Sequence, residues 1–297
     1  MTYRPLLSFQ YRELEFIRYL HLFRTPFLDY FFLLWSYADR SGFFIILFPI
    51  IWFGISELWG ARLFYLVCAQ MHVVNMLKSI FNLPRPCVID PSVGILHLTS
   101  PGMPSGAAMS SIILPGMLIY AYPRWWTWLV GGLFWFFLSF SRVYLGVHFP
   151  SDVFVGWCVG ALLLYLFIRY HQTLEDFLSR ISWRHALVIA VGVPVLLYLI
   201  AEAHIAPLSF AMAGISLGLA LNKRDKMWMT DPVSLTQRIT RIGICLLGVA
   251  VIYVLLTFEI SLFPYAWMKS FKKPLIQFIA GLWISRWVVY FIPKYAR

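Results

Sequence analysis

Residues 125–168, WWTWLVGGLFWFFLSFSRVYLGVHFPSDVFVGWCVGALLLYLFI, contain two apolar runs separated by a short segment that carries polar side chains. An α-helix needs about 20 apolar residues to cross the hydrocarbon core of a bilayer, and each run approaches that length. The connecting segment, residues 141–152, carries an arginine, a histidine and an aspartate. The stretch therefore predicts two membrane-spanning helices, 125–143 and 150–169, with polar side chains where they meet.

The composition extends this prediction to the whole chain. Of its 297 residues, 61% are hydrophobic and only 12% are charged, whereas soluble domains have about 25% charged residues. A surface that faces lipid explains the shortage of charge. The apolar runs predict ten helical segments, at 27–38, 42–57, 61–80, 104–122, 125–143, 150–169, 185–202, 206–222, 240–262 and 275–292. We expect an all-α, polytopic integral membrane protein with a six-helix core and about four additional transmembrane helices.

A polar stretch at residues 170–184 divides the chain into two parts. We expect residues 1–170 to form a membrane-embedded core. Residues 171–297 then form a C-terminal transmembrane extension, in which the sequence shows no motif for a role. Nothing in the sequence specifies an oligomeric state.

The net charge of +11 points to anionic lipid headgroups and cytoplasmic loops as its partners. No basic block with interleaved aromatic residues forms a nucleic-acid surface, so we expect no nucleic-acid partner. The histidines, cysteines and carboxylates show no metal-ligand spacing. We therefore expect no metal and no cofactor.

The distribution of lysine and arginine predicts an orientation. With a cytoplasmic N-terminus, most of these residues fall on the cytoplasmic side, including the four N-terminal arginines, Arg4, Arg12, Arg18 and Arg24. The opposite side then holds Arg40, Lys78, Arg85, Arg142, Lys269, Lys272 and Lys273. This positive-inside bias places the ends of helices 61–80 and 125–143 on the extracytoplasmic face, periplasmic or lumenal.

Three stretches place polar residues where a lipid-facing helix would not. They are Lys78, six residues, then Arg85-Pro86; Pro104-Ser105-Gly106-Ala107-Ala108-Met109, which opens a helix; and Ser141-Arg142, five residues, His148, three residues, then Asp152. A helix N-terminus attracts anions through its free N–H groups and its dipole. Arginine adds a planar fork of donors that suits phosphate oxygens. Two arginines, one lysine and a helix N-terminus on one membrane face predict a phosphate site.

His148 and Asp152 are four residues apart, so they share one face if a helix begins at His148. A carboxylate that accepts from one imidazole nitrogen leaves the other nitrogen free. Such a histidine is a nucleophile toward phosphorus and forms a phosphohistidine that water then hydrolyses. A single lysine or arginine at a helix end is usually an anchor, and a His–Asp pair is often structural. The three stretches in one chain favour the catalytic interpretation.

Together the three stretches resemble the signature of the type 2 phosphatidic-acid phosphatase superfamily. That signature runs Lys, six residues, Arg-Pro; Pro-Ser-Gly-His; and Ser-Arg, five residues, His, three residues, Asp. The resemblance covers about residues 27–170 and implies a six-helix core with its catalytic site at the membrane surface. It also implies His148 as nucleophile and Asp152 as its orienting partner. The phosphate-binding residues that it implies are Lys78, Arg85, Ser105, Gly106 and Arg142.

The chain departs from this signature at Ala107, where the family has a histidine that protonates the leaving oxygen. An alanine cannot do so, and general acid catalysis contributes about 10² to 10⁴ in rate. Three explanations compete. The alanine is an engineered replacement that stops turnover, or the enzyme is natural and its leaving group needs little protonation, as in a lipid diphosphate. The third is a non-catalytic relative. In the natural enzyme another histidine could also substitute for the missing acid, and the candidate is His97, in an active-side loop between the first two stretches.

The resemblance implies a hydrolase that removes phosphate from a lipid phosphate or a lipid diphosphate. A polyprenyl diphosphate, phosphatidic acid, phosphatidylglycerol phosphate and a sphingoid phosphate all fit as the phosphorylated membrane lipid. One alternative is a lipid phosphotransferase of the same architecture, in which a hydroxyl replaces water. Another is a non-catalytic membrane protein that binds lipid phosphates. Transport is disfavoured, because the C-terminal helices hold few intramembrane charges apart from Arg286.

Overall fold

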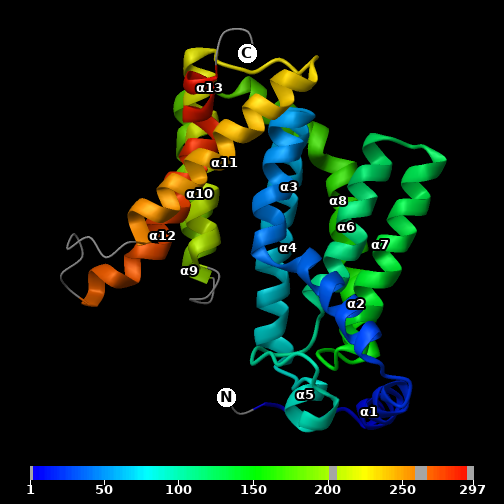
Figure 1. The fold of residues 1–297 in the computed structure, drawn as a ribbon. Coiled ribbons are helices and arrows are strands. Elements are labelled where there is room, and N and C mark those ends of the chain that lie inside the picture. Colours follow the sequence, from blue (N-terminus) through cyan, green and yellow to red (C-terminus); the bar gives the residue numbers. More distant parts are fainter. Residues whose placement is uncertain (1–2, 201–205, 258–265, 293–297) are drawn as a thin grey trace. The chain divides into compact units, whose positions relative to one another are not determined.

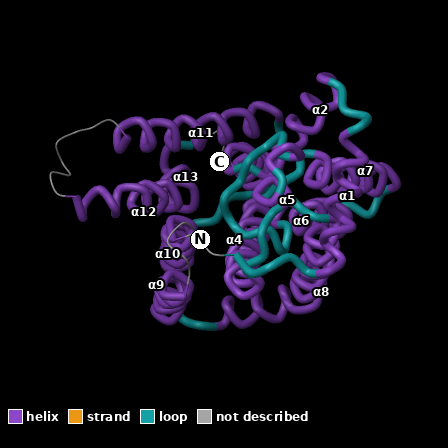
Figure 2. Tube along the Cα trace, turned by 90° about the horizontal axis from the view of Figure 1, so that it is seen from below, coloured by secondary structure: helices purple, strands orange, loops and turns teal. Residues whose placement is uncertain are grey.

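The computed structural model describes residues 3–200, 206–257 and 266–292. Their regular structure is helical throughout (Figure 1), and these residues contain no strand (Figure 2). Within these ranges, five helices are long and apolar enough to cross a membrane, and a bent pair raises the number to six. The predicted all-α membrane class is confirmed. The ends of two predicted segments, 201–202 and 258–262, lie outside the described residues.

Contacts divide the chain into two compact units, which are described separately. Unit 1 comprises Met1–Phe44 and Ala69–His171, and unit 2 comprises Ile45–Cys68 and Gln172–Arg297. Residues 45–68, which the sequence assigns to the core, therefore pack with the C-terminal part of the chain. The functional division into residues 1–170 and 171–297 stays a prediction.

Unit 1 is built from short surface helices and parts of longer spans. Its elements are α1 (Ser8–His21), α2 (Pro26–Ser36), η1 (Tyr37–Asp39), the start of α3 (Ser41–Gly54), the C-terminal half of α4 (Glu57–Phe81), α5 (Pro86–Ile89), η2 (Pro91–Val93), α6 (Gly106–Ala121), α7 (Trp125–Tyr144) and most of α8 (Pro150–Arg180). Thr25 starts α2 by accepting the Leu28 N–H at 3.3 Å, and Pro26 suits the first helical position.

Helices α2 and α3 are long and apolar enough to cross a membrane only as a pair, which is bent by 57° at a short break. The sequence predicted two separate segments here, at 27–38 and 42–57. The break contains η1 and Arg40, whose polar groups interrupt an otherwise apolar run. Counting this pair as one span changes the number of crossings before α4.

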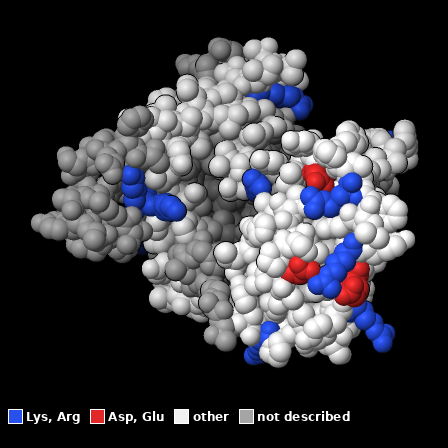
Figure 3. All heavy atoms as spheres, turned by 60° about the horizontal axis from the view of Figure 1, so that its bottom comes forward, with Lys and Arg blue, Asp and Glu red and all other residues white. Residues whose placement is uncertain are grey.

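The N-terminal segment lies at the same end of unit 1 as the loops that follow α4 and α7. The Arg4 N–H donates to the Asn82 carbonyl at 3.0 Å, and Arg18 pairs with Asp90 at 2.6 Å. Figure 3 shows basic and acidic side chains beside one another on this end. The prediction that Arg4, Arg12, Arg18 and Arg24 lie opposite the phosphate site is therefore wrong, because the bent pair was counted as two crossings.

Small residues let α8 approach α6 closely. A Cβ at Gly156 would lie 2.6 Å from the Ser105 carbonyl oxygen, and one at Gly160 would lie 3.0 Å from the Met109 Cα. The first distance is shorter than real Cβ contacts, so position 156 needs glycine, and the second is tight enough that a larger residue would push α6 away. Below this contact a buried cluster ties α1 to the later helices; it consists of Leu14, Ile17, Val93, Ala108, Val143, Phe149 and Val153.

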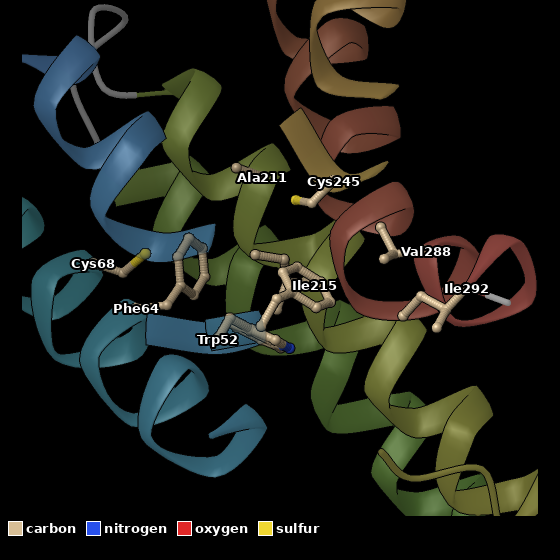
Figure 4. Close-up of a cluster of buried hydrophobic side chains, with 9 residues drawn as sticks. Trp52, Phe64, Cys68, Ala211, Ile215, Cys245, Val288 and Ile292 are labelled. Atoms are coloured by element: carbon tan, nitrogen blue, oxygen red, sulfur yellow. The ribbon is translucent and has the colours of Figure 1, made fainter. Parts of the chain in front are cut away.

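Unit 2 contains the end of α3, the start of α4, and the helices that follow α8. These are α9 (Trp183–Ile200), α10 (Ala206–Asp225), α11 (Leu235–Thr257), α12 (Ala266–Leu282), the π-helical segment η3 (Trp283–Trp287) and α13 (Val288–Phe291). Figure 4 shows its apolar core, formed by Trp52, Phe53, Phe64, Cys68, Ala211, Ile215, Cys245, Val288 and Ile292. A Cβ at Gly214 would lie 2.1 Å from the Phe278 carbonyl oxygen, so α10 and α12 are also in close contact.

Candidate active site

The N-terminus of α6 carries the second polar stretch. The Ser105 Oγ accepts the Ala108 N–H at 3.3 Å, and the Ser105 N–H donates to the Asp152 carbonyl at 2.9 Å. Helix geometry leaves the N–H groups of Gly106 and Ala107 without an intrahelical acceptor. Ser105 therefore serves as the helix cap, and the two residues after it present the donors that attract an anion.

A tight turn after α7 sets the position of His148. Gly146 has φ of +67°, and a Cβ there would lie 1.9 Å from the Val93 carbonyl oxygen, so only glycine fits. The N–H groups of Val147 and His148 both donate to the Arg142 carbonyl at 3.2 Å. The turn therefore folds His148 back over the end of the helix that carries Arg142.

His148 lies between a carboxylate and a guanidinium. Its Nδ1 is 3.4 Å from the Asp152 Oδ2, which also accepts the Phe149 N–H at 2.9 Å. Its Nε2 is 3.0 Å from the Arg85 Nη1, which can only donate. The arrangement fits a neutral ring with its proton on Nδ1 and its lone pair on Nε2. Both His148 and Asp152 are buried.

The charge state of His148 follows from its surroundings. Burial lowers its pKa well below the ordinary 6.5, and the positive charges of Arg85, Lys78 and Arg142 lower it further. The imidazole is therefore neutral at neutral pH, which is the form that a nucleophile needs.

Arg85 ties the loop before α6 to the loop before α8. Its Nε donates to the Ser100 carbonyl at 2.6 Å, its Nη1 to the Val147 carbonyl at 2.8 Å and its Nη2 to the Ser100 Oγ at 3.0 Å. The side chain is almost fully buried. Arg85 thus builds the site as well as lending it positive charge.

Lys78 and Arg142 reach the same region from α4 and α7. The Lys78 Nζ donates to the Pro101 carbonyl at 2.8 Å, and the Arg142 Nε donates to the Ser141 Oγ at 3.1 Å. The Arg142 Nη2 is buried and has no hydrogen-bond partner within the described part of the chain. Buried polar groups are nearly always satisfied, so this nitrogen has a hydrogen-bond donor that a ligand could use.

Two carboxylates near the site were missed by the sequence analysis. Glu13 of α1 accepts the Ser151 N–H at 2.8 Å and the Ser151 hydroxyl at 2.7 Å, and so caps α8 beside Asp152. Asp39 of η1 accepts the Ser110 hydroxyl at 2.9 Å. No local pattern identifies Glu13, because its partner is 138 residues away. Asp39 did have a signal, since an acidic residue interrupts an apolar run there.

His97 lies in the loop that also carries Ser100 and Pro101, the partners of Arg85 and Lys78. His97 is exposed in the loop after η2, and its ring lies close to Gly94. Within the described ranges, no three residues among histidine, cysteine, aspartate and glutamate lie close enough to hold a metal ion.

Comparison with known proteins gives consistent matches. Residues 59–176 match the PAP2 superfamily, and residues 208–295 match the transmembrane extension of PAP2 superfamily phosphatases. Sphingosine-1-phosphate phosphatase 1 from Mus musculus is 26% identical over 272 residues, 84% of this chain and 61% of that protein. Phosphatidylglycerophosphatase B from Bacillus subtilis is 26% identical over 169 residues, 52% of this chain and 81% of that protein.

An undecaprenyl-diphosphatase from Sulfolobus acidocaldarius is 31% identical over 108 residues, 36% of this chain and 46% of that protein. The crystal structure of a PAP2-type phosphatidylglycerolphosphate phosphatase from Bacillus subtilis aligns with a TM-score of 0.50 at 23% identity, and covers 57% of this chain and 88% of that one. The chain spans 41% of the Rattus norvegicus sphingosine-1-phosphate phosphatase 1 and 61% of the Mus musculus protein. These matches and the apolar helices identify a multi-pass integral membrane protein.

Proposed function

The chain belongs to the PAP2 superfamily, and we propose that it hydrolyses a lipid phosphate or a lipid diphosphate through a phosphohistidine on His148. The observation that carries this proposal is the convergence of three cationic side chains on a buried His–Asp pair within unit 1. Its named relatives act on phosphorylated lipids of different chemistry, so the headgroup phosphate is the feature they share.

Each residue has a physical role in this reaction. Lys78, Arg85 and Arg142 surround the phosphate oxygens and offset the charge that develops in the transition state. The N–H groups at the start of α6 bind a further oxygen. The bound phosphate takes the place of the His148 Nε2 at the Arg85 guanidinium, and the freed Nε2 then attacks phosphorus. Asp152 holds the imidazole ring with the ring proton on Nδ1.

The substrate enters laterally, with its tail in the bilayer and its headgroup at the cationic site. The lipid-facing surface favours this path, since the apolar helices expose many large hydrophobic side chains. Lateral entry explains how relatives with different lipid tails share one phosphate site.

A direct assay tests the proposal. The purified protein in lipid nanodiscs is given a lipid monophosphate and a lipid diphosphate, and released phosphate is measured for the wild type, Ala107→His and His148→Ala. We expect release by the wild type and none by His148→Ala. A wild type and an Ala107→His variant that both bind lipid phosphate but release nothing would instead identify a non-catalytic binding protein, the alternative that Ala107 favours.

We also propose that the site opens on the extracytoplasmic face, which requires an extracytoplasmic N-terminus as well, because the N-terminal arginines lie at the same end of unit 1 as the site. The opposite ends of α7 and α8 carry Arg124 and Arg180, and positive charge there favours the cytoplasmic side. A matched pair of cysteine variants tests this, because His97 lies in a loop at the site and Ser182 lies in the loop at the other end of α8; both residues are exposed. An impermeant thiol reagent added to intact cells is expected to label His97→Cys and not Ser182→Cys. The reverse pattern would place the site on the cytoplasmic face.

A further inference from the structure

The proposed reaction lacks a proton donor at position 107, where a buried alanine begins the first turn of α6. We infer that Asp39, in the break between α2 and α3, donates the proton to the leaving oxygen; this inference rests on the proposed phosphatase function. Such a donor must lie beside the start of α6. It must also lie close to the phosphate-binding cations, and it must have an oxygen that is not already hydrogen-bonded.

Asp39 meets the first condition through Ser110, which lies one helical turn after Ala107. The Ser110 hydroxyl donates to the Asp39 Oδ1 at 2.9 Å and accepts the Gln70 Nε2–H at 2.7 Å. The same Gln70 nitrogen is 3.1 Å from the Gly106 carbonyl. Asp39 is thus fixed against the first turns of α6 by a chain of three side chains.

This chain also determines which oxygen of Asp39 carries the proton. The Ser110 hydroxyl has one proton, which it donates to the Asp39 Oδ1, and it accepts one hydrogen bond from Gln70. Asp39 forms no other hydrogen bond among the described residues, so a proton on its carboxyl resides on Oδ2. That O–H is then available to a substrate oxygen.

The second condition is met by the charges around Asp39. Arg142 and Lys78 both act electrostatically on its carboxyl, and both are assigned above to the phosphate. A phosphate dianion bound between these cations repels a negative charge on Asp39, so its presence favours the protonated Asp39 carboxyl. An ionisable residue inside a membrane-spanning pair of helices is otherwise rare, and it commonly has a functional role.

The step balances as follows. The Nε2 lone pair of His148 forms the P–N bond, the P–O bond to the lipid breaks, and its electron pair stays on the leaving oxygen. That oxygen takes the proton from the Asp39 Oδ2. In the second half, water attacks phosphorus and gives a proton to the Asp39 carboxylate, while the P–N pair returns to His148. Lipid phosphate and water become lipid alcohol and inorganic phosphate, and Asp39 is protonated again.

The experiment compares two leaving groups on one lipid chain. A monophosphate expels an alcohol with a pKa near that of water, about 15.7, whereas a diphosphate expels a phosphate monoester with a second pKa of about 6. Asp39→Asn keeps the shape of the side chain but removes the acid. We expect its kcat on the monophosphate to fall about 10²- to 10⁴-fold, and its kcat on the diphosphate to fall less than about tenfold.

Two controls accompany this comparison. Asp29→Asn removes a carboxylate of α2 that pairs with Arg24 and accepts the Tyr144 hydroxyl. It should leave kcat unchanged on both the monophosphate and the diphosphate. Adding Ala107→His to Asp39→Asn should restore monophosphate hydrolysis, because the histidine supplies the missing acid. If Asp39→Asn does not fold, Ser110→Ala replaces it, with the same selective loss expected on a smaller scale, about tenfold.

Equal losses on both substrates would show that Asp39 only balances the charge of Arg142, and would overturn the inference. Unchanged kinetics in Asp39→Asn, or no rescue by histidine at position 107, would overturn it as well and leave the phosphatase function standing. A wild type that releases no phosphate from either substrate would contradict the proposed function itself.

Discussion

Among the described residues, each unit of the molecule buries two arginines, Arg85 and Arg142 in unit 1 and Arg241 and Arg286 in unit 2. Arg286 and Arg142 are bonded very differently. In unit 2, Arg286 donates to the Asn222 amide oxygen at 2.9 Å and to the Tyr290 hydroxyl at 2.7 Å, and it pairs with Asp225. In unit 1, Arg142 donates to the adjacent Ser141 hydroxyl and keeps a buried Nη2 without a partner in the described chain. The first arginine is satisfied by protein groups, whereas the second retains a donor for a ligand.

The contrast separates structural charge from functional charge. A buried charge is costly unless it is paired, and a bound phosphate would complete the bonding of the Arg142 guanidinium. The π-helical segment around Arg286 is a feature often found at functional sites. Its several partners in α10 nevertheless favour a role in holding α10 and η3 together.

Among the variants that test this comparison, the largest expected effect comes from Arg142→Gln. Removing a donor that stabilises transition-state charge costs about 10²- to 10³-fold in kcat, and we expect that loss in phosphate release. The thermal unfolding midpoint should change little, because few protein bonds are lost. A variant with normal activity would remove Arg142 from the phosphate site.

Arg286→Gln should show the opposite pattern. The Asn222 amide oxygen loses its donor, and a buried acceptor without a partner costs about 1–3 kcal/mol. We expect a lower unfolding midpoint in detergent, with unchanged kcat and KM for the folded fraction. A selective loss of kcat would instead assign unit 2 a direct part in the chemistry.

The pH dependence tests the electrostatics of unit 1. Because the pKa of His148 is lowered, the imidazole stays neutral below pH 6.5, and the acidic limb of kcat/KM assigned to His148 should lie below that value. Substrate titration, with a second phosphate pKa of about 6, is measured separately and removed. An enzyme limb at or above pH 6.5 would contradict the proposed charge arrangement.

The same pKa shift predicts a change in stability. The unfolded chain binds a proton at His148 below about pH 6.5, whereas the folded chain does not, so protons favour unfolding. Above about pH 6.5 the titration of His148 therefore does not reduce the free energy of unfolding, and below that pH it reduces this free energy progressively. His148→Ala should lessen this decline in thermal unfolding scans, and an unchanged decline would argue against a lowered pKa.

The smallest expected effect concerns Glu13. Glu13→Gln keeps one acceptor for Ser151 but loses the charge at the start of α8, and capping interactions are worth about 0.5–2 kcal/mol. We expect less than about a tenfold loss of kcat together with a modest loss of stability. Glu15→Gln is the matched control on the same helix, since its side chain is exposed and pairs only with Arg18. A loss comparable with that of Arg142→Gln would place Glu13 in the chemistry.

The sequence predicted the membrane class and the family correctly, and its three stretches do meet in unit 1. It could do so because their spacing reflects local structure: α4 ends before Asn82, which has φ of +45°, Pro86 starts α5, Ser105 caps α6, and Gly146 makes the turn before His148. The roles of the individual residues stay predictions. Ser105, expected to bind phosphate, uses its side chain as a helix cap.

What the sequence did not provide are the long-range contacts. Glu13 reaches Ser151 across 138 residues, and Asp39 reaches Ser110 across 71. The prediction that the N-terminal arginines lie on the side opposite the site was wrong for a related reason. A bend of 57° between α2 and α3 cannot be read from hydropathy, yet it decides on which side the N-terminal arginines lie.

The central claim is that His148 carries the phosphoryl group, and trapping that intermediate tests it most directly. The protein is mixed with a lipid substrate radiolabelled at the transferred phosphate, quenched in alkali within one turnover and examined for protein-bound label. We predict an alkali-stable, acid-labile phosphate on His148 of the wild type and none in His148→Ala. Turnover by the wild type without label at His148, or equal labelling of His148→Ala, would contradict the account.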